Sequence, residues 1–96
     1  MKPVRWHPLA IEEARRAGEY YESQRAGLNE RFSEAVTAAV ALLESFPALG
    51  ARVHRDYRRV IVHRFPYSVI YREHSTFLRV VAVVHHKLDP DHWIGR

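Results

Sequence analysis

The chain has 96 residues, of which 47% are apolar, enough for a single domain with one core over residues 1–96. No apolar run reaches the length of about 18 residues that crosses a bilayer, and the first residues lack the apolar stretch of a secretory signal. We therefore expect no membrane contact. The sequence contains no cysteine, which excludes disulfides and thiolate-bound metals and favours a cytoplasmic protein.

The net charge of +4 is unevenly distributed along the chain. Residues 1–51 carry six Lys/Arg and seven Asp/Glu, whereas residues 52–96 carry nine Lys/Arg and four Asp/Glu. A basic second half indicates an anionic partner, either a nucleic acid or an acidic protein. The alternative is an arginine-rich solvated surface without a partner.

Two helices are predicted in the first half. A short strand at Pro3 to His7 precedes Pro8, which suits the first turn of a helix that runs to about Gln24. One stripe of this helix carries Ala10, Ala14, Ala17 and Tyr21. Gly27 separates it from a second helix, from Leu28 to Phe46, whose apolar residues recur every three or four positions: Leu28, Phe32, Ala35, Val36, Ala39, Leu42, Leu43 and Phe46.

The second half is predicted to form strands. Residues 48–56 are interpreted as a loop, and strands are expected at 57–63, 67–72 and 76–85. The last of these is apolar at nearly every position, as in a strand buried on both faces. The fold class is therefore α+β, in the order β-α-α-β-β-β, with a largely antiparallel sheet packed against a helical hairpin. The tail from residue 89 forms one helical turn or stays irregular.

His85 and His86 end the last strand, and His92 follows. Adjacent strand residues point to opposite faces, so the pair is not expected to bind one metal, and we expect no metal and no cofactor. Polar residues at a strand end are the favoured interpretation. A histidine acting as general acid or base is the alternative, since imidazole titrates near neutral pH.

Basic and aromatic side chains alternate along the predicted sheet. The basic ones are Arg58, Arg59, Arg64, Arg72, Arg79 and Lys87, and the aromatic ones are Tyr57, Tyr67, Tyr71 and Trp93. Guanidinium groups bind phosphate and aromatic rings stack on bases, which is typical of a nucleic-acid surface. Two alternatives stay open: the aromatic residues belong to the core and its rim, or the groove holds an acidic peptide of a partner protein.

Two segments, Arg64 to Arg72 and Val81 to Trp93, resemble the RelE/ParE superfamily of toxins from bacterial type II toxin–antitoxin modules. The stretches Glu19 to Glu22 and Gly27 to Phe32 and the pair Phe46-Pro47 are similar to the helical hairpin of the same superfamily. The resemblance implies a small toxin that is neutralised by a cognate antitoxin, which itself binds operator DNA. It also implies one of two targets: DNA gyrase for ParE-type members, or the ribosome and its mRNA for RelE-type ribonucleases.

The sequence matches only some of the residues that the resemblance implies for a RelE-type ribonuclease site. Arg59 and Lys87 match basic positions of the RelE-type site, whereas Ser68 stands where that pattern has an arginine, Trp93 where it has a tyrosine and Ile61 near a lysine position. A ParE-like gyrase inhibitor is therefore the favoured hypothesis, with the RelE-like ribonuclease as the alternative.

The candidate site residues follow from these two hypotheses. Under the ribonuclease alternative the catalytic residues are Arg59, His85, His86 and Lys87, with Arg64 assisting. For partner binding we expect Arg58, Arg64, Tyr67, Arg72 and Trp93.

Overall fold

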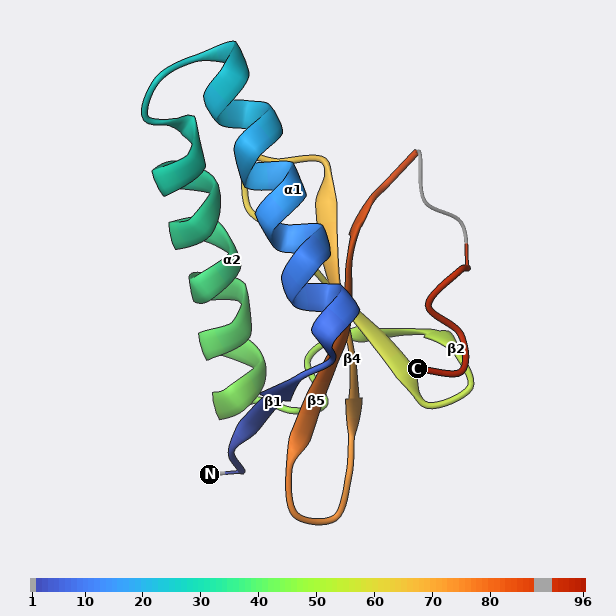
Figure 1. Ribbon diagram of the computed structural model, residues 1–96. Helices are drawn as coiled ribbons and strands as arrows, with labels where there is room; N and C mark the ends of the chain where they lie inside the picture. The colour runs from blue at the N-terminus through green and yellow to red at the C-terminus, as the bar shows by residue number, and fades with distance from the viewer. Residues whose placement is uncertain (1, 88–90) are drawn as a thin grey trace.

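The computed structural model describes residues 2–87 and 91–96. Two helices pack on one face of a single sheet (Figure 1). In chain order the elements are β1 (Val4–Trp6), α1 (Pro8–Gln24), α2 (Leu28–Ser45), β2 (Ala51–His54), β3 (Tyr57–Ile61), β4 (Tyr67–Glu73) and β5 (Leu78–His85). The predicted α+β class with a helical hairpin against a sheet is confirmed.

The sheet has the order β1-β5-β4-β3-β2, so the first strand lies beside the last. β1 pairs with β5 in parallel, and the other neighbours are antiparallel. From Leu78 to Val84 every residue of β5 except Arg79 is buried. The sheet is therefore largely antiparallel with its most apolar strand inside, as the sequence predicts.

One strand was not predicted. Ala51–His54 forms β2, an edge strand paired with β3, within the segment interpreted as a loop. Its first three residues are exposed, and its pairing with β3 shifts between Arg52 and His54. Such a strand buries little side-chain surface, so it leaves no pattern of buried residues in the sequence. The order is thus β-α-α-β-β-β-β.

The hairpin is defined by local signals. His7 caps α1, its Nδ1 accepting a hydrogen bond from the Leu9 N–H at 3.1 Å, and Pro8 follows in the first turn. Between the helices Gly27 has φ +92°, a left-handed conformation that favours glycine. The Glu22 carboxylate accepts hydrogen bonds from the N–H groups of Gly27 and Asn29. The helices therefore turn back on each other within three residues.

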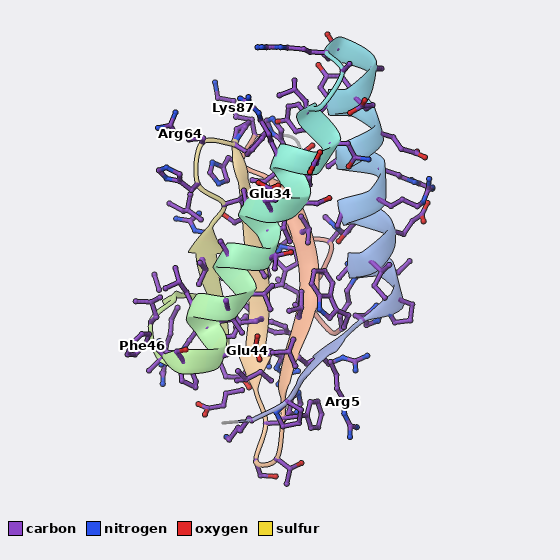
Figure 2. All side chains as sticks on the ribbon, turned by 90° about the vertical axis from the view of Figure 1, so that its left-hand side faces the viewer. Arg5, Glu34, Glu44, Phe46, Arg64 and Lys87 are labelled. Carbon is purple, nitrogen blue, oxygen red and sulfur yellow. The ribbon has the colours of Figure 1, made fainter. Side chains whose placement is uncertain are left out.

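The hairpin and one sheet face enclose the main core. Its helical side consists of Ala10, Ala17, Phe32, Val36, Ala39, Val40 and Leu43, and its sheet side of Val60, Val62, Val69, Tyr71, Leu78, Val80 and Val83. Of the predicted α2 stripe, Leu28 is only half-buried and lies outside this core. Leu42, which is 48% exposed, and Phe46, which is 61% exposed, lie outside it too. They occupy the last turns, where Figure 2 shows Phe46 projecting from the end of α2. The apolar spacing of the sequence continues past the part of α2 that the sheet covers, so these two apolar side chains remain exposed.

A buried tyrosine anchors the connection from α2 to the sheet. The Tyr71 hydroxyl accepts a hydrogen bond from the Gly50 N–H at 2.9 Å and donates one to the Pro47 carbonyl at 2.8 Å. Burial raises the pKa of this phenol. A Cβ at Gly50 would lie 2.7 Å from the hydroxyl oxygen, so this position has room only for glycine. Arg58 adds hydrogen bonds to the carbonyls of Ala48 and Gly50.

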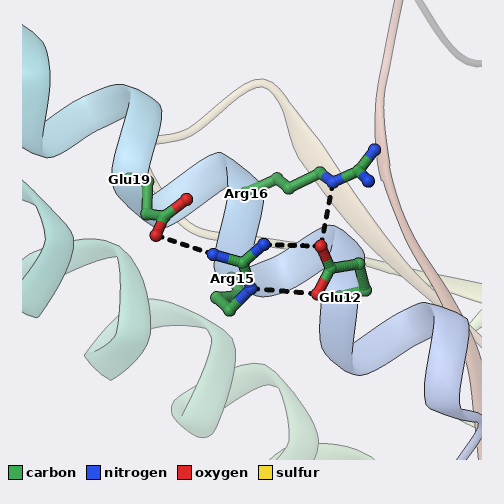
Figure 3. Close-up of polar contacts among 4 residues, drawn as sticks. All are labelled: Glu12, Arg15, Arg16 and Glu19. Carbon is green, nitrogen blue, oxygen red and sulfur yellow. Dashed lines mark hydrogen bonds and ion pairs between the residues drawn. The ribbon is translucent and has the colours of Figure 1, made fainter.

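The exposed face of α1 carries a network of ion pairs (Figure 3). Arg15 pairs with Glu12 and Glu19, and Arg16 also pairs with Glu12. The two guanidinium groups lower the pKa of Glu12 from 4.5 to about 2. Exposed pairs at this spacing stabilise a helix only modestly, because salt and water screen them.

Replacing Tyr71 with Phe is expected to lower the free energy of unfolding by about 1–3 kcal/mol, because the buried Gly50 N–H loses its acceptor. Urea denaturation followed by circular dichroism measures the change. The matched control is Tyr20→Phe, since Tyr20 is 58% exposed and its loss of a hydroxyl is expected to change little. Equal effects of the two substitutions would contradict the anchoring role.

The pKa of Glu12 predicts a pH dependence of stability. Because its folded-state pKa lies below the ordinary value of 4.5, the ionised carboxylate stabilises the folded protein above pH 4.5, and this contribution disappears as the pH falls toward 2. The loss of stability between pH 5 and pH 2 is therefore expected to be smaller in Glu12→Gln than in the parent, and the difference is expected to shrink in high salt. Thermal melts across that range test it; parallel curves would contradict it.

Candidate sheet pocket

A hollow of about 250 Å³ lies on the sheet face opposite the helices. We call it the sheet pocket. It is lined by Val53, Arg59, Ser68, Ile70, Val84, His85, His86, Asp91 and Trp93. These residues come from β2, β3, β4, β5 and the C-terminal segment, so the pocket exists only in the folded sheet. Three of the four residues predicted as catalytic under the ribonuclease alternative meet here: Arg59, His85 and His86.

The two neighbouring histidines have different surroundings. The ring of His86 lies with its Nε2 2.8 Å from the Ser68 hydroxyl, and Ser68 is fully buried on the pocket side. The ring of His85 packs edge-on against Tyr67, 5.1 Å between centroids, and its Nδ1 accepts a hydrogen bond from the Lys87 N–H. The two rings thus contact different neighbours, although both residues line the pocket, and His86 follows the last residue of β5. The buried hydroxyl gives His86 a fixed orientation toward the pocket.

Arg59 provides the positive charge of the pocket. It is exposed on β3, where it pairs with Ile70 across the strands, and within residues 2–87 and 91–96 its side chain makes no hydrogen bond or ion pair. Asp91 lines the same hollow from the C-terminal segment. A guanidinium, an imidazole and a carboxylate around one small hollow can bind a polar group and move a proton.

Four of the residues predicted to bind a partner have contacts within the protein. Arg58 binds the carbonyls of Ala48 and Gly50, and Tyr67 packs in an aromatic cluster with Tyr21, Phe32 and Phe65. Arg72 lies over the Tyr57 ring, and its ion pair with Asp56 lowers the pKa of that carboxyl. Trp93 is only 4% exposed. A role of these residues in partner binding stays a prediction.

Arg64 and Lys87 are two exposed members of the predicted set, and they lie at one end of the molecule (Figure 2). Arg64 occupies the β3–β4 turn with φ +69°, and its Nε donates a hydrogen bond to Nε2 of His63 at 3.3 Å. The turn and the end of β5 are tied together, because the His86 N–H donates to the Pro66 carbonyl at 2.9 Å. Two cations thus lie close to His86 without lining the pocket.

A larger hollow, of about 430 Å³, lies on the other side of the molecule between β1, α1 and α2. It is lined by Trp6, Ile11, Ala14, Arg15, Phe32, Ser33, Val36 and Thr37 and is mainly apolar. The sequence hinted at it only through Ile11, an apolar residue beside the buried stripe of α1 that remains 55% exposed. Sequence reasoning missed this hollow, and it missed Val53 and Asp91 in the sheet pocket, because these residues come together only through strand pairing and chain return.

The part of the chain that the structure describes contains neither a cluster of metal ligands nor a helix that could span a membrane. Among residues 2–87 and 91–96, no group of three or more histidine and carboxylate side chains is arranged to hold a metal ion. In those same residues, no helix has the length and apolar character needed to span a bilayer. The segment Leu88-Asp89-Pro90 of the resembling motif, with the start of the predicted tail turn, lies outside the described residues.

Comparison with known proteins settles the family. The model of the family described as "ParE toxin of type II toxin-antitoxin system, parDE" matches residues 4–90. The chain belongs to this family. The superfamily resemblance seen in the sequence is thereby confirmed. No curated protein sequence matches the chain.

A solved structure of the family supports the fold. A chain from the chromosomal ParDE toxin–antitoxin system of P. aeruginosa superimposes with a TM-score of 0.67. The match covers 88% of this chain and 96% of that one at 16% identity. Similarity at this level of identity concerns the fold alone.

Proposed function

We propose that this ParE-family protein inhibits DNA gyrase in the cytoplasm and is neutralised by a cognate antitoxin, through which alone it contacts operator DNA. The family match over residues 4–90 carries the proposal. Two positions of the sheet support it against the ribonuclease alternative. Ser68, where a RelE-type toxin has an arginine, is fully buried, and Trp93, where it has a tyrosine, is also buried and has an indole that cannot act as an acid or a base.

In this proposal the basic groups of the second half bind rather than catalyse. Arg59, Arg64 and Lys87 are exposed, and the half that contains them has five more basic than acidic side chains. Such a surface attracts an acidic protein partner and accelerates its association. The antitoxin is therefore proposed to carry acidic residues in the segment that covers this surface, so that it competes with the target for the same cations.

A supercoiling assay with purified protein, gyrase, ATP and relaxed plasmid tests the gyrase proposal. Loss of supercoiling together with trapped cleaved plasmid is expected. The triple variant Arg59→Gln, Arg64→Gln, Lys87→Gln is expected to inhibit at least about tenfold less, since interface charges change both encounter rate and affinity. The matched control is Arg25→Gln, an exposed cation at the C-cap of α1 that does not line the sheet pocket. Unimpaired supercoiling at micromolar protein would overturn the proposal.

The ribonuclease alternative rests on one specific observation: Arg59 and His86 line the same pocket, and Ser68 fixes the His86 ring. In metal-independent RNA cleavage, an imidazole takes the proton of the 2′-hydroxyl and the 2′-oxygen attacks phosphorus. The 5′-oxygen then leaves and takes a proton from water, giving a 2′,3′-cyclic phosphate and a 5′-hydroxyl. Here His86 would accept the proton, and Arg59 would stabilise the extra negative charge on the phosphoryl oxygens. Lys87 would hold the neighbouring phosphate.

Cleavage of mRNA in a translating extract tests this alternative. His86→Gln and Arg59→Ala are each expected to slow cleavage by about 10²–10⁴-fold, the usual contribution of a proton-transfer group or a positioned cation. The matched control is His54→Gln, a partly exposed histidine on the edge strand that does not line the pocket. Cleavage that persists unchanged in the His86 and Arg59 variants would remove the ribonuclease function from this pocket.

A further inference from the structure

The C-terminal segment, residues 91–96, packs on the sheet face opposite the helices; we call it the strap (Figure 1). Trp93 is buried in a second apolar cluster with Tyr57, Ile70, Val81, Ala82 and Val84, and its ring centroid lies 5.0 Å from that of Tyr57. The Gly95 N–H donates to the Tyr57 hydroxyl at 2.9 Å. The strap also supplies Asp91 and Trp93 to the wall of the sheet pocket.

One carboxylate on α1 joins the strap to the rest of the protein. Oε1 of Glu13 accepts hydrogen bonds from the Val83 N–H at 3.1 Å and from Nη1 of Arg96 at 3.0 Å. Its Oε2 lies 2.7 Å from Nε2 of His92. Arg96 in turn donates to the Val81 carbonyl at 3.0 Å. Glu13 therefore contacts both ends of the strap and the strand beneath it.

The position of this contact follows from the short first strand. β1 pairs with β5 only as far as Val80, and the His7 N–H donates a hydrogen bond to the Val80 carbonyl. Just after Val80, β5 contains a β-bulge. Ile70 of β4 pairs with Ala82 and Tyr71 pairs with Val80, so Val81 is an extra residue without a partner in β4. The Val81 carbonyl and the Val83 N–H thus have no strand beside them. The side chains of Arg96 and Glu13 satisfy them instead, as buried backbone groups require.

We propose that Glu13 is the positioning residue that holds the strap closed, and that loss of its carboxylate releases the strap, exposes Trp93 and removes one wall of the sheet pocket. The proposal goes beyond the choice of target, since neither candidate function uses Glu13. Both partners are largely shielded from water: the Glu13 side chain is 22% exposed and that of Arg96 is 12% exposed. Such a pair is screened less than one on the surface.

The chain offers a matched control one residue away. Glu12 has the same charge and lies on the same helix, but its ion pairs are with Arg15 and Arg16 of α1 itself. Removal of either carboxylate changes the net charge equally, and removal of Glu12 breaks ion pairs within α1 alone. Only removal of Glu13 takes a partner from the strap.

Nuclear magnetic resonance of the uniformly ¹⁵N-labelled full chain tests the proposal. The observables are the hydrogen-exchange rate of the Gly95 amide and the solvent exchange of the Trp93 indole N–H, with the Trp6 indole as an internal reference. In Glu13→Ala and Arg96→Ala both rates are expected to rise by at least roughly tenfold, as for a locally opened segment. Glu12→Ala is expected to match the parent.

Two further variants separate positioning from general destabilisation. Glu13→Ala also leaves the Val83 N–H without an acceptor, so if this variant fails to fold, Arg96→Ala decides, because it keeps the Glu13–Val83 hydrogen bond. Arg96→Lys retains a cation for Glu13 and is expected to restore most of the Gly95 protection. Parent-like protection of Gly95 in folded Arg96→Ala, or equal loss in the Glu12 and Glu13 variants, would overturn the proposal. These readouts need neither gyrase nor antitoxin, so their outcome is separate from that of the supercoiling assay.

Discussion

The burial of β5 on both faces is the constraint on which the rest of the structure depends. A strand with apolar residues on both sides must be covered twice, here by the helical hairpin on one face and by Trp93 with Tyr57 on the other. Its edges must be covered too, and β1 reaches only Val80. Glu13 and Arg96 complete that edge with side chains, which draws the end of the chain back onto the sheet. Packing and backbone hydrogen bonding thus both fix the strap.

The same constraint creates the sheet pocket. Where the strap meets β3 and β4 it leaves a hollow that contains Arg59, His86 and Asp91 above the buried Ser68. The fold therefore separates two kinds of surface: a polar hollow in a basic sheet face, and an apolar hollow between the helices and β1.

The family relationship fixes the protein as a toxin of the ParE type. The same fold supports binding and chemistry, and the side chains in the pocket decide between them.

Much of the fold was predictable because its signals are local. Pro8 and Gly27 placed the helix ends, and the alternation around Val60 and Val69 placed the strand faces. Three features gave no such signal. The β2 strand lacks buried residues, Phe46 extends past the sheet that covers the rest of its helix, and Glu13 looks like any acidic residue near the start of a helix. Their environments depend on elements far away in the sequence.

By itself the sequence determined the fold class, the helical hairpin, the buried last strand and the toxin superfamily. Periodicity, turn residues and a short motif act over a few neighbouring positions, so these features can be predicted locally. Only the tertiary structure decided which side chains meet. It placed β1 beside β5, brought Ser68 to His86, buried Trp93 on Tyr57 and joined Glu13 to Arg96, 83 residues further along the chain. Such contacts depend on strand order and chain return, which packing of the whole core selects.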